Sequence, residues 1–171
     1  MSHAMRRHKQ MLPFDECLDI LEEGAYGILG TGGTDGYPYA LPISYAFEAD
    51  PDGSAETPRG RLYLHCATTG HKLDALAANP RVCFTVVGRS QVVPEELTNF
   101  YRSVITFGTA HLAEGDEKMR GLIALGNKYC PGLDDFVSEE IDKAFKRLDV
   151  LVIELEAITG KEAINLTRQR P

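Results

Sequence analysis

The chain has 171 residues, 43% hydrophobic and 25% charged, which suffices for one globular core. Its formal net charge of −7 argues against a nucleic-acid or anionic-membrane surface, since both need a basic field. The four cysteines lack the short spacing of a zinc site and are typical of buried thiols in a reducing compartment. These features predict a cytoplasmic protein that binds neither nucleic acid nor membrane.

The N-terminal segment, residues 1–11, is polar and has no apolar stretch behind its basic residues, so it does not predict a signal peptide. No apolar run approaches the roughly 20 residues of a membrane span. We expect residues 1–11 to be disordered or tag-like, and residues 12–171 to form a single domain.

Helical spacing of apolar residues predicts a helix over 13–23, and a short strand follows over 26–30. The glycine-rich segment 31–36 is a hairpin turn rather than a phosphate loop, because no Gly-Lys-Ser/Thr follows it. The next strand, 37–47, contains two prolines, which cannot donate to a β-ladder. We therefore expect an edge strand with backbone groups available to a planar ligand, or otherwise a kinked barrel strand. Residues 48–61 read as an exposed hairpin loop.

Residues 62–80 contain the pattern on which the predicted function mainly depends. A β-rich apolar run breaks at Thr68-Thr69-Gly70 and continues as helix formers as far as Asn79-Pro80. A turn that opens a helix exposes backbone N–H groups at the positive end of the helix dipole, which suits an anion. With His71 and Lys72 close by, the pattern predicts a phosphate-binding site for a nucleotide-like cofactor. The alternative is that Lys72 is an ordinary solvated helix residue.

The second half of the chain continues the strand pattern. We expect a strand buried largely on both faces over 81–87, an irregular segment over 88–101 with a helical turn at 94–96, and a strand over 103–112 with Ile105 and Phe107 on one side. Two helices should follow, one over 116–129 that is weakened by two glycines and one capped by Ser138. A last strand over 150–157 and a C-terminal tail end the chain. The hairpin connections predict a mainly β fold with flanking helices, a six-stranded antiparallel barrel.

Several local patterns resemble one family. They are Tyr37-Pro38-Tyr39-Ala40-Leu41-Pro42-Ile43-Ser44-Tyr45, His65-Cys66-Ala67-Thr68-Thr69-Gly70-His71-Lys72, Ser103-Val104-Ile105-Thr106-Phe107-Gly108 and Ile158-Thr159-Gly160-Lys161. Together they are similar to the nitroimidazole-resistance (Nim) proteins of the pyridoxamine 5′-phosphate oxidase-like, FMN-binding split-barrel superfamily. The resemblance covers about residues 6–162; the 49–60 hairpin is longer than is usual in that family.

The resemblance implies a split β-barrel that forms a homodimer with FMN at the subunit interface. It implies that Tyr39, Ala40 and Leu41 contact the flavin ring, that His65, Cys66 and Ala67 line the strand that leads to the phosphate, and that Thr68, Gly70, His71 and Lys72 bind the phosphate. It also implies that Ser103 and Val104 reach the flavin from the partner subunit, and that Gly160 and Lys161 reach it from the C-terminal end. No metal site is expected, because neither His65 nor His111 has a cysteine or acid at ligand spacing.

The implied activity is reduction of a small-molecule electron acceptor, such as a nitroaromatic, by the flavin. His71 is the candidate catalytic residue, since an imidazole can exchange a proton near neutral pH. Three alternatives stay open: a pyridoxamine 5′-phosphate oxidase that uses Arg168 and Arg170 for its substrate phosphate, a non-catalytic flavin-binding module, and a barrel that holds haem or a deazaflavin.

Overall fold

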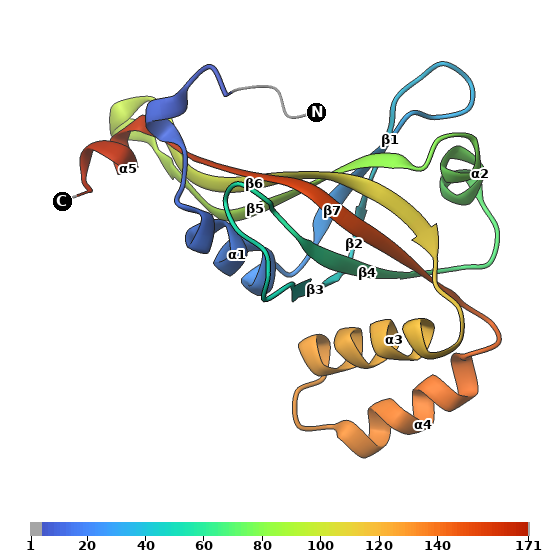
Figure 1. Cartoon of the computed structure of the whole chain (residues 1–171). Coiled ribbons are helices and arrows are strands. Elements are labelled where there is room, and N and C mark those ends of the chain that lie inside the picture. Colours follow the sequence, from blue (N-terminus) through green and yellow to red (C-terminus); the bar gives the residue numbers. More distant parts are fainter. Residues whose placement is uncertain (1–4, 171) are drawn as a thin grey trace.

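The computed structural model describes residues 5–170, which fold around one antiparallel sheet with the order β2-β1-β5-β6-β7-β4-β3 (Figure 1). The strands are β1 Gly27–Thr31, β2 Tyr39–Ile43, β3 Ala46–Ala49, β4 Gly60–Cys66, β5 Arg81–Val93, β6 Thr98–Leu112 and β7 Asp149–Glu162. The helices are α1 Phe14–Glu23, α2 His71–Ala78, α3 Gly115–Tyr129, α4 Asp134–Ala144 and α5 Ile164–Arg168, with short 3₁₀ turns η1 His8–Gln10 and η2 Pro94–Glu96.

The sheet has seven strands and is not closed, so the expected count of six was wrong. The single strand expected over 37–47 divides at Ser44–Tyr45 into β2 and β3, which lie at opposite edges of the sheet. The corner is fixed by hydrogen bonds: the buried Tyr45 hydroxyl donates to the Leu21 carbonyl at 2.6 Å, and Tyr45 N–H donates to the Tyr129 hydroxyl at 3.0 Å. Because the two edge strands are consecutive in the chain, the sheet must curl until its edges meet at this corner.

One face of the curled sheet packs on α1 and holds the main core. The apolar stripe of α1, including Cys17, Ile20 and Leu21, contacts inward-facing side chains from all the long strands, such as Leu62, Phe84 and Val104. Burial raises the pKa of the Cys17 thiol to about 11, so this cysteine is an inert core residue. The helix expected over 13–23 is confirmed, with Pro13 at its N-cap.

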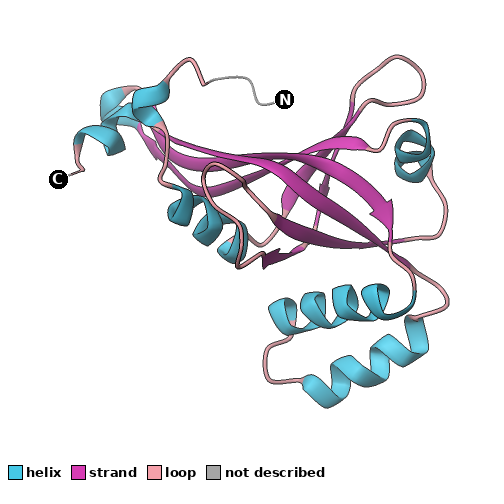
Figure 2. Cartoon of the chain, viewed as in Figure 1, coloured by secondary structure: helices cyan, strands magenta, loops and turns pink. Residues whose placement is uncertain are grey.

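On the opposite face the α3–α4 hairpin packs over β4 and β7, and α3 also lies against β3 (Figure 2). The glycines that weaken the helix pattern are sites of close approach. A Cβ at Gly121 would lie 2.8 Å from Tyr63, and a Cβ at Gly126 would lie 2.3 Å from Val137 of α4. α4 begins at Asp134 rather than after Ser138, because packing of Val137 against α3 extends the helix by a turn.

Two segments expected to be irregular are regular. Residues 88–101 form a long β5–β6 hairpin around η2, with a bulge between Val87 and Arg89. The C-terminal tail continues β7 to Glu162 and ends in α5. At the other terminus, where we expected residues 1–11 to be disordered, residues 8–10 form η1 and the buried Gln10 side chain donates to the Glu162 carbonyl at 2.9 Å. Residues 1–4 lie outside the described part.

The outer face of β1, β5 and β6 carries no helix and is apolar. The alternation expected for β6 is confirmed, since Val104 is fully buried while Ile105 and Phe107 are 41% and 44% exposed. The expectation that residues 81–87 are buried on both faces was wrong for a single chain, because Val87 is 57% exposed. Within residues 5–170, no helix has both the length and the hydropathy to span a bilayer.

Candidate functional site

The segment expected to bind phosphate lies where β4 leaves the sheet. His65 and Cys66 end β4, residues 67–70 form an exposed loop, and α2 begins at His71. Gly70 occupies the N-cap with φ 133°, a conformation that favours glycine, and a Cβ there would meet open space. The loop is therefore open above the first turn of α2.

The first turn of α2 has the donors that an anion needs. The Gly70 carbonyl accepts from the N–H groups of Leu73 and Asp74 at 2.8 and 3.2 Å, so helical bonding starts there. The N–H groups of His71 and Lys72 precede it and have no place in the intrahelical pattern. Since a glycine N-cap supplies no side-chain oxygen, these donors and the helix dipole face the exposed loop.

Lys72 adds a cation at the same place. Its ammonium lies beside the thiol of Cys66, which is 7% exposed. Burial raises the pKa of the Cys66 thiol, and the positive charge of Lys72 opposes that shift without cancelling it. The thiol therefore stays neutral, and the lysine charge remains available to an anion in the loop.

The segment expected to contact the cofactor ring is brought to the same place by a contact that the sequence did not predict. The Tyr39 ring meets the His71 ring edge-on, with centroids 4.6 Å apart, and so joins β2 to the start of α2. β2 is an edge strand, as its prolines predicted, and pairs only with β1. Half of the backbone groups of Tyr39, Ala40 and Leu41 therefore point away from the sheet.

Four other predicted residues lie together, but elsewhere. Ser103 pairs with Lys161, and Val104 pairs with Gly160, across β6 and β7. Val104 is fully buried between β5 and β7, and the Gly160 carbonyl accepts from the Leu12 N–H at 3.1 Å, so the backbone of both residues takes part in pairing within the chain. The half-exposed Lys161 places its ammonium 5.4 Å from the centroid of the Tyr101 ring.

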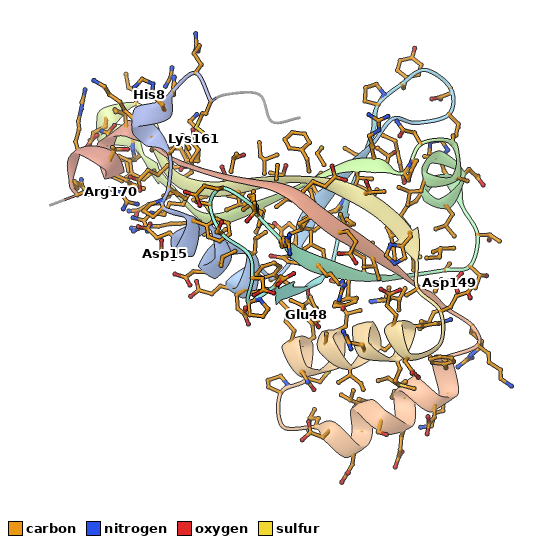
Figure 3. The ribbon with its side chains drawn as sticks, viewed as in Figure 1. His8, Asp15, Glu48, Asp149, Lys161 and Arg170 are labelled. Atoms are coloured by element: carbon orange, nitrogen blue, oxygen red, sulfur yellow. The ribbon has the colours of Figure 1, made fainter. Side chains whose placement is uncertain are left out.

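These four residues are remote from the loop 67–70 of their own chain, which is expected to bind phosphate. Cys66, next to that loop, pairs with Asp149 at the start of β7, whereas Lys161 is near its end. Figure 3 shows Asp149 and Lys161 at opposite ends of the molecule. Twelve residues of strand separate them, roughly 40 Å along the chain. A single chain does not bring the two sets together.

The C-terminal arginines considered as a substrate-phosphate site differ in their surroundings. Arg170 donates two hydrogen bonds to Glu16 at 2.7 Å each, and its Nε donates to Glu162 at 2.6 Å. Glu162 is fully buried and also pairs with Arg102 at 3.2 Å. Arg170 is thus hydrogen-bonded to carboxylates of its own chain. Of the two arginines, only Arg168 is exposed.

The Tyr39–His71 contact and this ion-pair network were missed because both join residues far apart in the sequence. The Gly70-His71-Lys72 motif at the start of α2 could have indicated that the His71 side chain contacts another residue, but not which residue. For the network, the opposite charges of Glu16 and Arg170 near the two termini were the signal that the sequence offered.

An antiparallel sheet whose two edges meet, with an uncapped helix N-terminus at one edge, is the architecture of a split-barrel protein. Residues 13–162 match the family model described as pyridoxamine 5′-phosphate oxidase, and the chain belongs to this family. No curated protein matches the chain.

Solved structures share the fold at low sequence identity. A conserved hypothetical protein of Mycobacterium tuberculosis is 18% identical with a TM-score of 0.76, covering 98% of this chain and 94% of its own. A candidate 5-nitroimidazole antibiotic resistance protein of Bacteroides thetaiotaomicron is 21% identical with a TM-score of 0.68, covering 89% and 86%. An FAD- and haem-binding protein of Mycobacterium smegmatis is 23% identical with a TM-score of 0.69, covering 91% and 73%.

Proposed function

We propose that the protein is a homodimeric FMN-dependent oxidoreductase that reduces nitroaromatic or related small acceptors. The observation that carries the proposal is the Tyr39–His71 contact, which places the edge strand β2 beside the uncapped start of α2. Membership of the pyridoxamine 5′-phosphate oxidase family supports it. So do the structural relatives described as a nitroimidazole-resistance candidate and as FAD- and haem-binding.

The loop residues fit a phosphate monoester better than a bulkier diphosphate. The first two N–H groups of α2, the exposed residues Thr68 and Thr69, and Lys72 all lie within two residues of Gly70, where a Cβ would meet open space. A dianion there would gain charge-assisted hydrogen bonds from the lysine and favourable interaction with the helix dipole. FMN ends in such a monoester, which is why we propose FMN rather than FAD.

β2 and His71 would orient the ring and the acceptor. Outward-facing backbone groups of β2 can hydrogen-bond the polar edge of an isoalloxazine, and Tyr39 holds the His71 imidazole next to this strand. From that position the imidazole can donate a proton to an acceptor. Bound flavin supplies the electron transfer; the protein residues bind, orient and exchange the proton.

The dimer is proposed from the bare face of the sheet. The pairing places Ile28, Thr85 and Ile105 in one row across β1, β5 and β6, and Cys83 and Phe107 in the next. Three of these side chains are large, apolar and more than a third exposed. A second copy covering this face would bury them, and would allow Ser103 and Lys161 of one subunit to approach the α2 loop of the other.

The cofactor test is the absorption spectrum of the purified protein and of the chromophore that denaturation releases. We expect FMN, identified by mass, in one equivalent per chain. Release of FAD, haem or a deazaflavin would replace the cofactor assignment, and a colourless protein that refuses added FMN would overturn the proposal.

Activity and assembly are tested separately. With FMN bound, we expect reductant-dependent loss of a 5-nitroimidazole, no pyridoxal phosphate formation, and turnover about 100-fold slower in His71→Ala with flavin retained. A flavin that is never reoxidised by any acceptor would favour a non-catalytic binding module. For the dimer, Phe107→Arg should give monomers by sedimentation while the exposed-residue control Val92→Arg stays dimeric.

A further inference from the structure

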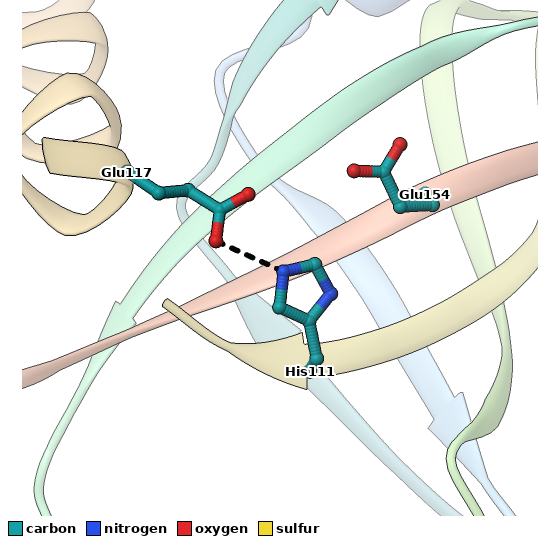
Figure 4. Close-up of side chains that lie close together, drawn as sticks. All are labelled: His111, Glu117 and Glu154. Atoms are coloured by element: carbon teal, nitrogen blue, oxygen red, sulfur yellow. Dashed lines mark hydrogen bonds and ion pairs between the residues drawn. The ribbon is translucent and has the colours of Figure 1, made fainter. Parts of the chain in front are cut away.

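A second cluster of ligand-type side chains lies outside all the residues assigned to the flavin. His111 near the end of β6, Glu117 in the first turn of α3 and Glu154 in β7 lie close together, with the Glu117 carboxylate on the His111 ring and Glu154 beside them (Figure 4). One ligand atom from each, an imidazole nitrogen or a carboxylate oxygen, lies within 4.8 Å of the other two. We propose that these three residues bind one divalent transition-metal ion, with zinc as its representative.

The geometry is close to that of a bound ion. His111 Nε2 lies 3.0 Å from Glu117 Oε2. Ligand atoms about 2.1 Å from a tetrahedral zinc are about 3.4 Å apart, so this pair already has nearly the required separation. Glu154 reaches the same point by a small side-chain rotation, since its side chain is 44% exposed.

The neighbouring charges leave one Glu154 oxygen for the ion. Arg61 Nε donates to Glu154 Oε1 at 2.6 Å, which leaves Oε2 for the cluster. Glu117 and Glu154 each carry a negative charge, of which Arg61 offsets the one on Glu154, so the cluster still attracts a cation. Arg61 thus takes the role of the outer group that orients a metal ligand.

The ligand types restrict the metal. Magnesium and calcium prefer sites made only of oxygen atoms, whereas an imidazole with two carboxylates suits zinc and its first-row neighbours. All three side chains are more than a third exposed, so water can complete the coordination. The spacing of 43 residues between His111 and Glu154 explains why the sequence gave no sign of the site.

The ion would have a structural consequence. It would tie the start of α3 to β6 and β7, at the point where the α3–α4 hairpin leaves the sheet (Figure 1). A ligand that binds only the folded protein stabilises it. Zinc at about 100 times its Kd should therefore raise the melting temperature by roughly 5–10 °C.

The test is calorimetric titration of the chelator-treated full chain with zinc, alongside thermal melts with and without zinc. We expect one saturable equivalent in the parent protein. Binding should weaken roughly 100-fold or more in His111→Ala, Glu117→Gln and Glu154→Gln, and be unchanged in the control Glu114→Gln, which removes a nearby exposed charge. Melts without zinc establish that each variant is folded, which matters for Glu154 because of its Arg61 pair.

Cobalt(II) distinguishes this site from adventitious binding by cysteine. Thiolate ligation gives an intense near-ultraviolet charge-transfer band, whereas nitrogen and oxygen ligands do not. A weak visible spectrum without that band, lost in Glu117→Gln, supports the site. Absence of binding, a thiolate band, or zinc affinity unchanged in all three ligand variants would overturn the proposal.

Discussion

Two charged clusters lie at opposite ends of the sheet, and they differ in whether their charges are already paired. At one end Arg170 and Arg102 surround the buried Glu162 and the partly buried Glu16, with nitrogen–oxygen distances of 2.6 to 3.4 Å. At the other end the α2 loop has a lysine, hydroxyls and helix N–H groups around an open position.

Whether the charges are already paired distinguishes a structural charge cluster from a binding site. The first cluster joins α1, β6, β7 and the C-terminus, and its charges satisfy one another, so its loss should affect folding. In the second cluster the Lys72 charge has no carboxylate partner described in the structure, so its loss should affect the ligand more than the fold. Each prediction below tests one side of this distinction.

The largest expected effect is on stability, at the paired cluster. Glu162→Gln removes the charge that two arginines share in a fully buried position. Breaking a fully buried pair costs about 3–5 kcal/mol. Because Arg170 and Arg102 are partly exposed and keep Glu16 as a partner, we expect the lower end of that range, about 3 kcal/mol. Urea unfolding should show this loss, with the exposed Glu156→Gln as the control; a loss below about 1 kcal/mol would contradict the structural role.

The next effect is on ligand affinity, at the open cluster. Lys72→Ala should weaken FMN binding by about 1.5–3 kcal/mol, since a charge-assisted contact is lost. Titration of apoprotein followed by flavin fluorescence measures it, and unfolding free energy should change little. Lys143→Ala, an exposed lysine on α4, is the control. Unchanged affinity would remove Lys72 from the site.

A smaller effect tests whether the paired end of one subunit contributes to the open end of another. Lys161→Ala should weaken FMN binding by about 1 kcal/mol, because its ammonium is half-exposed and screened. The loss should occur only at protein concentrations where the dimer forms, as flavin titrations across a dilution series would show. A loss that is equal in monomers would disprove the contribution of the partner.

The smallest effect is on acid stability. Hydrogen bonding to Arg170 lowers the pKa of Glu16 below its ordinary value of 4.5. A lowered folded-state pKa stabilises the protein above about pH 4.5, and that stabilisation is lost as the pH falls through the folded pKa. Glu16→Gln should therefore flatten the acid limb of the urea midpoint against pH. The exposed Glu23→Gln should leave that limb steep, and two equally steep limbs would contradict the assignment.

Local patterns predicted the parts of the fold whose cause is local. The helix over 13–23, the edge position of β2 and the two faces of β6 followed from spacing and from proline, and the structure confirms them. The start of α4 and the regular β5–β6 hairpin were missed, because packing of Val137 on Gly126 and pairing across the sheet decide them. The residues of the cofactor site remain predictions.

Residues 62–78 form a strand, a loop and a helix because turn and helix preferences act between neighbouring residues, so the amino-acid order is enough to predict this element. Long-range packing, in contrast, brings Tyr39 to His71, two arginines to Glu162, and His111 to Glu117 and Glu154. Each of these contacts joins different elements. Their proximity depends on how the sheet curls and what packs on it, which no local pattern records.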